Sequence, residues 1–317
     1  MLRWQDVERP LVAIVGPTAS GKSELALKLA EAFSGEIVNC DALQLYRGFD
    51  IGTAKTPIDA RRGIPHHLLD ALDPQMSFSA GDYARAAKEI ISEISSRGHL
   101  PLVVGGTGFY LRALLEGLPA LPGRDDSLRQ RLNQRELRRP GTLHKLLGRL
   151  EPSAAARIHR RDVQKTTRAL EIRLLTRAAL PAPAAAVPLS GFRICQIGLA
   201  PERSLLADAI AARTRQIFAA GLVEEVRGLL AQGLSGEEKP FESLGYEQAL
   251  AHLRGQISLE QAMESTALET RQYAKRQLTW FRGTSKRDAR ITWFTGFGND
   301  PAIAEACLEA LGKFLSE

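Results

Sequence analysis

Short apolar runs that end in small or polar residues recur along the chain. Residues 11–15 form a continuous apolar run, rich in β-branched residues, that ends in Gly-Pro, and residues 36–40, 102–104 and 192–199 also have the composition of strands. Such runs are typical of buried parallel strands. Helical periodicity lies between them, at residues 22–33 and 80–97. The alternation predicts an α/β fold in which helices flank a parallel sheet.

The alternation of strands and helices stops between residues 119 and 190. This stretch is helical in pattern and ends in a Pro/Ala-rich run at residues 180–188, which is typical of a semi-rigid spacer. We therefore expect an inserted helical subdomain at 119–190 and a catalytic core formed by residues 1–118 and 191–317. Helical periodicity returns at residues 203–282 of the core.

Positive charge is concentrated in the predicted insertion. The whole chain has a net charge of +6, whereas residues 119–195 alone contain 16 Lys and Arg against 6 Asp and Glu. The rest of the chain is therefore mildly acidic. A basic segment on an acidic body favours a polyanion such as RNA as its partner. A solubilising helical surface is the alternative interpretation.

Several classes of protein are disfavoured by composition. The chain has no apolar run of about 18 residues or more, so no membrane span is expected. Its first ten residues lack the apolar core of a signal peptide. The three cysteines stand far apart without a CxxC pair, which fits a reducing cytoplasm and offers no zinc site. We expect a cytoplasmic monomer.

Residues 16–23, GPTASGKS, match the phosphate-binding pattern GxxxxGK[ST] between a predicted strand and a predicted helix. Backbone N–H groups and the helix N-terminus would surround phosphate oxygens there. Lys22 would add a positive charge, and Ser23 would offer a hydroxyl group to Mg²⁺. The expected diphosphate-binding residues are Gly16, Pro17, Thr18, Ala19, Ser20, Gly21, Lys22 and Ser23.

The acidic residue that normally accompanies such a loop is displaced. ATPases and GTPases of this type usually place a carboxylate at the end of another apolar strand. Here the run at 102–104 ends in Gly-Gly-Thr-Gly, whereas the run at 36–40 ends in Asp41. This arrangement weakens a plain NTPase interpretation.

Six blocks of the sequence, taken in order, resemble the tRNA dimethylallyltransferases. The blocks lie at residues 16–23, 41–48, 50–55, 63–70, 105–110 and 271–280. The resemblance extends from about residue 12 to residue 282 and implies a P-loop NTPase-like fold. It also implies transfer of a dimethylallyl group from dimethylallyl diphosphate to N6 of the adenine 3′-adjacent to the anticodon of tRNA, with release of diphosphate.

Three residues are candidates for catalysis. The exocyclic amine of adenine is a poor nucleophile, so an acceptor for its proton should help, and Asp41 at a strand end is the candidate. Donors around the leaving diphosphate should stabilise its growing charge. The resemblance implies that Arg213 is one of them and that Thr107 contacts the substrate adenine. Asp41 could instead cap a turn, and Arg213 could be a solvated helix charge.

The anticodon stem-loop of tRNA is the expected macromolecular partner. An adenine stacked in RNA must be extruded at a cost of about a few kcal/mol, which other RNA contacts have to offset. Arg271, Lys275 and Arg282 are spaced four and seven residues apart, on one stripe of a helix. The matched motifs imply tRNA contacts from Asp41, Ala42, Leu43, Gln44, Thr107, Arg129, Gln164, Lys165, Thr166, Thr167, Arg168, Arg271, Lys275, Arg276 and Gln277.

Three positions depart from the pattern of the resembled family. Ala42 replaces the usual Ser, Lys165 stands where Arg is common, and Glu242 stands where relatives often carry Arg. Lys cannot make the bidentate phosphate contact of Arg. Three alternatives remain: prenyl transfer to free adenine nucleotide, an ATP-dependent small-molecule kinase, and a non-catalytic RNA-binding module. The basic insertion argues against the first, because a mononucleotide needs no broad basic surface.

Overall fold

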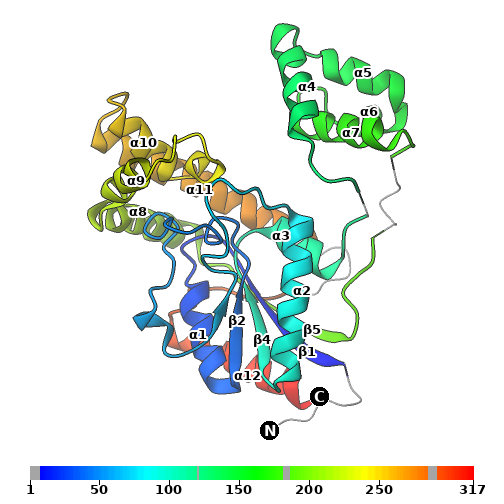
Figure 1. The fold of residues 1–317 in the computed structure, drawn as a ribbon. Helices are drawn as coiled ribbons and strands as arrows, with labels where there is room; N and C mark the ends of the chain where they lie inside the picture. The colour runs from blue at the N-terminus through cyan, green and yellow to red at the C-terminus, as the bar shows by residue number, and fades with distance from the viewer. Residues whose placement is uncertain (1–7, 120, 181–185, 285–290) are drawn as a thin grey trace. The chain divides into compact units, whose positions relative to one another are not determined.

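A single parallel sheet organises the larger part of the protein (Figure 1). The computed structural model describes residues 8–119, 121–180, 186–284 and 291–317. Its six strands are ordered β3-β2-β4-β1-β5-β6, and all neighbouring strands run parallel. The strands are β1 (Arg9–Val15), β2 (Gly35–Asn39), β3 (His66–His67), β4 (Leu100–Val104), β5 (Phe192–Leu199) and β6 (Ile291–Phe294).

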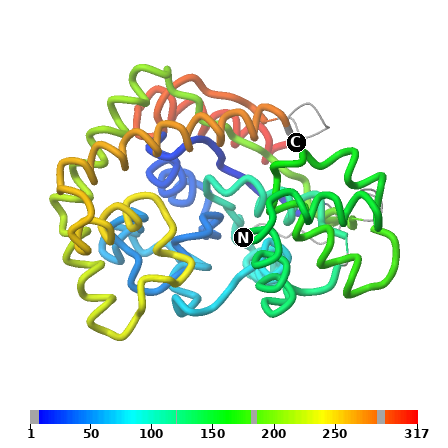
Figure 2. The backbone as a smooth tube through the Cα atoms, turned by 90° about the horizontal axis from the view of Figure 1, so that it is seen from above, coloured from blue at the N-terminus to red at the C-terminus, as the bar shows by residue number. Residues whose placement is uncertain are grey.

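Helices connect and cover these strands, as the α/β prediction required. The helices of this unit are α1 (Lys22–Phe33), α2 (Ala80–Ser96), α3 (Gly108–Leu115), α8 (Arg203–Ala219), α9 (Leu222–Ala231), α10 (Tyr246–Leu253), α11 (Leu259–Thr284) and α12 (Pro301–Ser316). Helix α11 packs along α8, and the orange tube of α11 is visible beside α8 in Figure 2. The expected fold class is confirmed.

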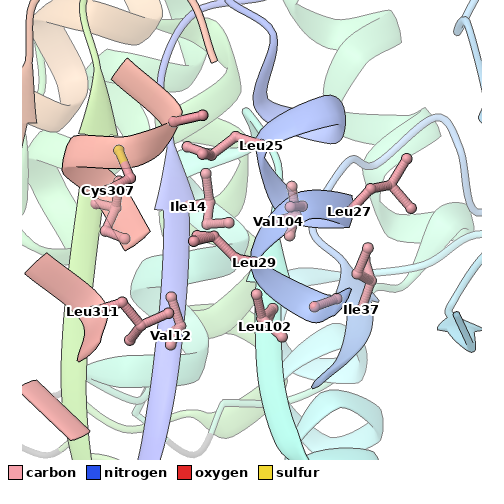
Figure 3. Packing of buried hydrophobic residues seen from close by; sticks show 14 of the residues in the cluster. Val12, Ile14, Leu25, Leu27, Leu29, Ile37, Leu102, Val104, Cys307 and Leu311 are labelled. Carbon is pink, nitrogen blue, oxygen red and sulfur yellow. The ribbon is translucent and has the colours of Figure 1, made fainter. Parts of the chain in front are cut away.

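The core lies between the sheet, α1 and α12 (Figure 3). Val12 and Ile14 lie two residues apart on β1, so their side chains point to the same face of the sheet. They meet Leu25 and Leu29 of α1, and Leu311 of α12 completes the layer. All five side chains are fully buried. Burying each contributes about 1.5–3 kcal/mol, so this layer fixes α1, and with it the preceding loop, on the sheet.

Residues 116–188 form a second compact unit. The sequence placed this boundary at 119 and 190. Its helices are α4 (Asp126–Arg138), α5 (Thr142–Leu150), α6 (Pro152–Arg157) and α7 (Val163–Thr176). The unit has its own apolar core, which includes Leu132, Leu143, Leu147 and Leu170. Residues 181–185 of the predicted spacer lie outside the described residues.

The sequence did not predict helix α3 of the larger unit, and it missed three further elements. These are the two-residue strand β3, the edge strand β6 and the helix α12. Among the described residues, no helix is both long and apolar enough to cross a membrane.

Candidate active site

The loops that follow β1, β2 and β4 meet at the carboxyl edge of the sheet. They line a cavity of about 490 Å³, whose other walls come from α8, α11 and residues 242–247. Because neighbouring parallel strands end at the same edge, residues distant in sequence converge there. Lys22, Asp41, Thr107 and Arg213 all line this cavity, so the structure brings the expected diphosphate site and the expected catalytic residues together.

The loop after β1 has the backbone of a phosphate cradle. Gly16 (φ 147°) and Gly21 (φ 81°) adopt positive φ, which glycine does without a steric penalty. A Cβ atom at Gly16 would also lie 2.7 Å from the carbonyl oxygen of Leu199. Helix α1 begins at Lys22, and the Lys22 Nζ donates to the Pro17 carbonyl oxygen at 2.6 Å. The loop therefore presents a helix N-terminus and an ammonium group to the cavity.

The ammonium group of Lys22 is held in an environment that disfavours its charge. Burial is the largest cause, and the positive charge of Arg213 adds to it; together they lower the pKa of Lys22 to about 7. The carboxylate of Asp41 opposes this change. An anion bound beside Lys22 would favour the protonated form, because it would offset both causes.

Arg213 reaches the cavity from α8. Burial lowers the pKa of its guanidinium, while the negative charge of Asp41 raises it. Its Nη2 donates to the carbonyl oxygen of Thr53 at 3.3 Å, which anchors the side chain to the loop after β2. Lys22 and Arg213 therefore bring two positive charges to the cavity, and the negative charge of Asp41 acts on both.

Asp41 is held by a local hydrogen-bond network after β2. The Asn39 side chain accepts the Asp41 N–H (3.0 Å) and donates to the Asp41 carbonyl oxygen (3.0 Å). One carboxylate oxygen of Asp41 accepts the N–H of Leu43 at 2.9 Å. The turn fixes the backbone of Asp41 and leaves its carboxylate at the cavity wall. Asp41 thus both caps a turn and lines the site.

Thr107 connects the loop after β4 to the loop of Asp41. Its Oγ1 accepts the N–H of Ala42 at 3.1 Å, and its own N–H donates to the Cys40 carbonyl oxygen at 3.2 Å. Gly105 permits this approach, because a Cβ atom there would lie 2.1 Å from the Cys40 carbonyl oxygen. The Gly-Gly-Thr-Gly turn is therefore packed against the Asp41 loop.

Helix α11 contributes residues that the sequence argument did not single out for the cavity. Tyr273 lines it four residues before Gln277, and burial raises the pKa of its phenol to about 12. Thr266, Glu269 and Thr270 line it from the same helix. The helical spacing of these positions from Gln277 was the available signal, but it is equally typical of core residues.

The expected RNA-binding residues of the loop after β2 also lie at the cavity. Ala42, Leu43 and Gln44 line it, and the side chain of Gln44 donates to the Thr53 carbonyl oxygen at 3.1 Å. Glu242, one of the departures, lines the same cavity and forms an ion pair with Lys239.

In the second unit, two of the expected RNA-binding arginines are engaged by one buried carboxylate. Glu171 is fully buried and accepts from Arg129 Nε and Nη2, both at 2.8 Å, and from Arg168 Nη1 at 2.6 Å. These donors lower the pKa of Glu171 to about 2, against the opposing effect of burial. Thr166 and Thr167 are buried, whereas Gln164 and Lys165 are exposed.

The remaining expected residues lie on α11. Arg271, Lys275, Arg276 and Arg282 are exposed, and the guanidinium of Arg282 lies 5.9 Å from the ring centre of Trp293. Gln277 is buried, and its side chain bonds to two loops of the protein. Helix α11 therefore presents a basic surface to solvent and a polar contact to the active-site loops.

A loop with the GxxxxGK[ST] pattern beside a carboxylate, on a parallel α/β sheet, is typical of enzymes of the P-loop class. Comparison with known proteins narrows this class. A family model described as IPP transferase matches residues 44–284. The chain belongs to the IPP transferase family, as the resemblance implied.

Curated relatives match the chain along nearly its whole length. A tRNA dimethylallyltransferase of Solibacter usitatus is 54% identical, covering 97% of this chain and all of the relative. One from Koribacter versatilis is 47% identical over 95% of this chain and 97% of its own. The solved structure of a tRNA isopentenylpyrophosphate transferase from Bacillus halodurans has a TM-score of 0.69 at 35% identity, covering 97% and 96% of the two chains.

Proposed function

We propose that this enzyme transfers the dimethylallyl group of dimethylallyl diphosphate to N6 of the adenine 3′-adjacent to the anticodon in tRNA. The relatives' names support tRNA prenyl transfer. The observation that carries the proposal is the shared cavity, which is lined by the loop of Lys22 together with Arg213, Asp41 and Thr107. The cations suit an anionic leaving group, and the carboxylate suits a nucleophile that must lose a proton.

The diphosphate of the donor binds at the loop formed by residues 16–23. Its oxygens accept from the backbone N–H groups at the start of α1, while Lys22 and Arg213 neutralise its charge. As the bond from C1 of the prenyl group to oxygen breaks, the electron pair leaves with the diphosphate. Donors already in place at that oxygen lower the barrier, because they need no reorganisation during the reaction.

The residues at the loop fit a Mg²⁺ ion bound together with the diphosphate. Ser23 is exposed at the second position of α1 and lines the cavity, so its hydroxyl oxygen can hold the ion. Among the described residues, no group of three or more His, Cys, Asp or Glu is placed to hold a metal ion. When bound, the ion would neutralise part of the charge on the diphosphate.

The acceptor adenine lies with N6 toward Asp41. N6 attacks C1 of the prenyl group, the new N–C bond forms as the C1–O bond breaks, and the carboxylate of Asp41 takes the proton from N6. Thr107 lies beside the Asp41 turn. Its oxygen already accepts the N–H of Ala42, so its hydroxyl group can donate a hydrogen bond to the adenine. The exposed cations of α11 and the basic second unit bind the RNA backbone and offset the cost of extruding the base.

Labelled dimethylallyl diphosphate, incubated with the enzyme, Mg²⁺ and unmodified tRNA, tests the proposal. Label should appear in N6-prenylated adenosine at the position 3′ of the anticodon. AMP offered in place of tRNA distinguishes the free-nucleotide alternative, and ATP offered as the donor distinguishes a kinase. Label on AMP alone, or none in the tRNA, would exclude the proposed reaction.

A further inference from the structure

The side chain of Gln277 joins the phosphate-binding loop to the loop after β4. Its Oε1 accepts the N–H of Thr18 at 2.8 Å, and its Nε2 donates to the Gly106 carbonyl oxygen at 3.0 Å. Gln277 is only 6% exposed. Thr18 and Gly106 belong to different loops, so one amide spans the two segments that line the donor and acceptor ends of the cavity.

The turn at residues 105–108 is shaped for this contact. A Cβ atom at Gly106 would lie 2.1 Å from the Nε2 of Gln277, too close for any larger residue unless the amide moved. A Cβ atom at Gly108 would lie 2.2 Å from the ring of Trp280, which is one helical turn further along α11. The glycines therefore let α11 lie directly on the turn.

The contacts continue from Gln277 to Asp41, the proposed general base. Gly106 is followed by Thr107, whose Oγ1 accepts from Ala42, the residue after Asp41. The path thus runs from Thr18 through Gln277 and Thr107 to the Asp41 turn. It is a physical connection between the part of the protein that holds the leaving group and the part that receives the proton.

We propose that Gln277 is a positioning residue that sets the separation between the donor diphosphate and the acceptor base. This inference rests on the proposed function. Prenyl transfer requires C1 and N6 to meet at about 3–3.5 Å and in line with the leaving oxygen, and small misplacements are costly. Gln277 keeps the two loops at one spacing through its two hydrogen bonds.

The sequence resemblance implied instead that Gln277 contacts tRNA, and the two roles have different consequences. A tRNA contact would act on RNA affinity. A positioning role would act on the chemical step, since neither substrate needs the side-chain amide in order to bind. The test is therefore to measure tRNA affinity and the rate of the chemical step separately.

Gln277→Met keeps most of the side-chain volume and removes both hydrogen bonds. We expect the single-turnover rate with saturating tRNA and donor to fall about tenfold or more, with each Kd changed less than about threefold. Gln272→Met, at an exposed position on the same helix, is the matched control and should react like the parent enzyme. An unchanged rate, or a loss confined to tRNA affinity, would overturn the proposal. Absence of prenyl transfer by the parent enzyme would instead refute the proposed function.

Gln277→Glu separates the two hydrogen bonds. The ionised carboxylate can accept from Thr18 but repels the Gly106 carbonyl oxygen, whereas the protonated carboxyl group can satisfy both. Burial beside a carbonyl oxygen raises the pKa of such a group. The rate of Gln277→Glu relative to the parent enzyme should therefore rise as pH falls from 8 to 6. The charged and titratable groups around the cavity are the same in both proteins, so their effects cancel in this ratio; they include Lys22, Asp41, Arg213, Glu269, Tyr273 and Arg276. A ratio that stays constant with pH would contradict the donor role of Nε2.

Discussion

The positive charge of Arg213 acts on Lys22 within the cavity and, together with burial, lowers the pKa of Lys22 to about 7. Two cations that repel each other form a strong site for a polyanion such as a diphosphate, because the ligand relieves the repulsion as it binds. At higher pH Lys22 loses its proton, so the repulsion disappears and the site attracts an anion less strongly. The pH dependence of donor binding should therefore report on this pair.

Donor affinity should fall as pH rises above 7. Below pH 7, Lys22 is protonated in the free enzyme, and the bound diphosphate keeps it protonated at higher pH. Binding must therefore take up a proton above pH 7, so affinity declines there by up to about tenfold per pH unit. The terminal phosphate of the donor, with a pKa of about 6, is already ionised in this range. Calorimetric titrations from pH 7 to 9, repeated in two buffers of different ionisation enthalpy, measure this uptake. Binding that is independent of both pH and buffer would contradict it.

Removal of the Asp41 carboxylate should slow the chemical step and spare RNA binding. Asp41→Asn keeps the acceptor for the Leu43 N–H but is a much weaker base. We expect turnover to fall at least about tenfold, since general-base catalysis contributes that much or more. Asp73→Asn, which removes a carboxylate paired with exposed Arg47, serves as a control. Filter binding should show unchanged tRNA affinity for both variants; undiminished turnover by Asp41→Asn would remove this residue from the mechanism.

The sequence predicted the meeting of the Lys22 loop and Asp41 better than it predicted the elements that surround them. The phosphate-binding motif and Asp41 each follow a recognisable apolar strand, so their meeting at one sheet edge was derivable. Strand β6 has four residues and α12 follows beyond the resembled region, so neither was predicted. Helix α12 nevertheless carried clear signals: Asp300 caps it, Pro301 begins it, and its apolar positions have helical spacing.

Side-chain partners explain the other differences between expectation and structure. A motif shows that Arg129 and Arg168 are basic, but it does not show that Glu171 is buried between them. It likewise does not show that Gln277 turns inward to two loops. Such pairings join residues far apart in sequence, so composition and periodicity carry no trace of them. The RNA contacts expected of these residues stay predictions.

The salt dependence of tRNA binding should become weaker when a lysine or arginine that contacts a phosphate is removed. Lys275 is exposed on α11, on the stripe that also carries Arg271. If it contacts a phosphate, Lys275→Ala should weaken binding and reduce the slope of log affinity against log salt by about one. Lys313→Ala, at an exposed position on α12, is the control for net charge. Equal salt slopes for Lys275→Ala and the parent enzyme would show that this part of α11 does not touch RNA.

Glu171 should be required for the stability of the second unit. Glu171→Ala leaves Arg129 and Arg168 without their shared carboxylate, and loss of one partner of a buried ion pair costs about 3–5 kcal/mol. The pKa of Glu171 is lowered from 4.5 to about 2, so its stabilising contribution is complete above pH 4.5 and is lost as pH falls toward 2. Hydrogen exchange should show faster opening of α4 and α7 in the variant, with the sheet unchanged. Arg124→Ala, which removes an exposed ion pair with Asp126, should have little effect. Unchanged protection of α7 in Glu171→Ala would contradict the role of this carboxylate.

The loop between β6 and α12 contacts the phosphate-binding loop through Gly298. Gly298 N–H donates to the Ser20 carbonyl oxygen at 2.9 Å, and a Cβ atom at Gly298 would lie 2.4 Å from the carbonyl oxygen of Gly21. Gly298→Ala must therefore push the two loops apart, at a cost of about 1–3 kcal/mol.

That displacement should weaken donor binding specifically. The displaced backbone at residues 20–21 directly precedes α1, whose first N–H groups would hold the diphosphate under the proposed function. We therefore expect the Kd for dimethylallyl diphosphate to rise about tenfold, equivalent to about 1.4 kcal/mol. The exposed cations of α11 are untouched, so tRNA affinity should stay within about threefold of the parent value. Gly312→Ala on α12 is the matched control, because its Cβ atom would lie an ordinary 3.9 Å from Phe33. If Gly298→Ala bound the donor as tightly as Gly312→Ala did, the contact between these two loops would have no part in shaping the diphosphate site.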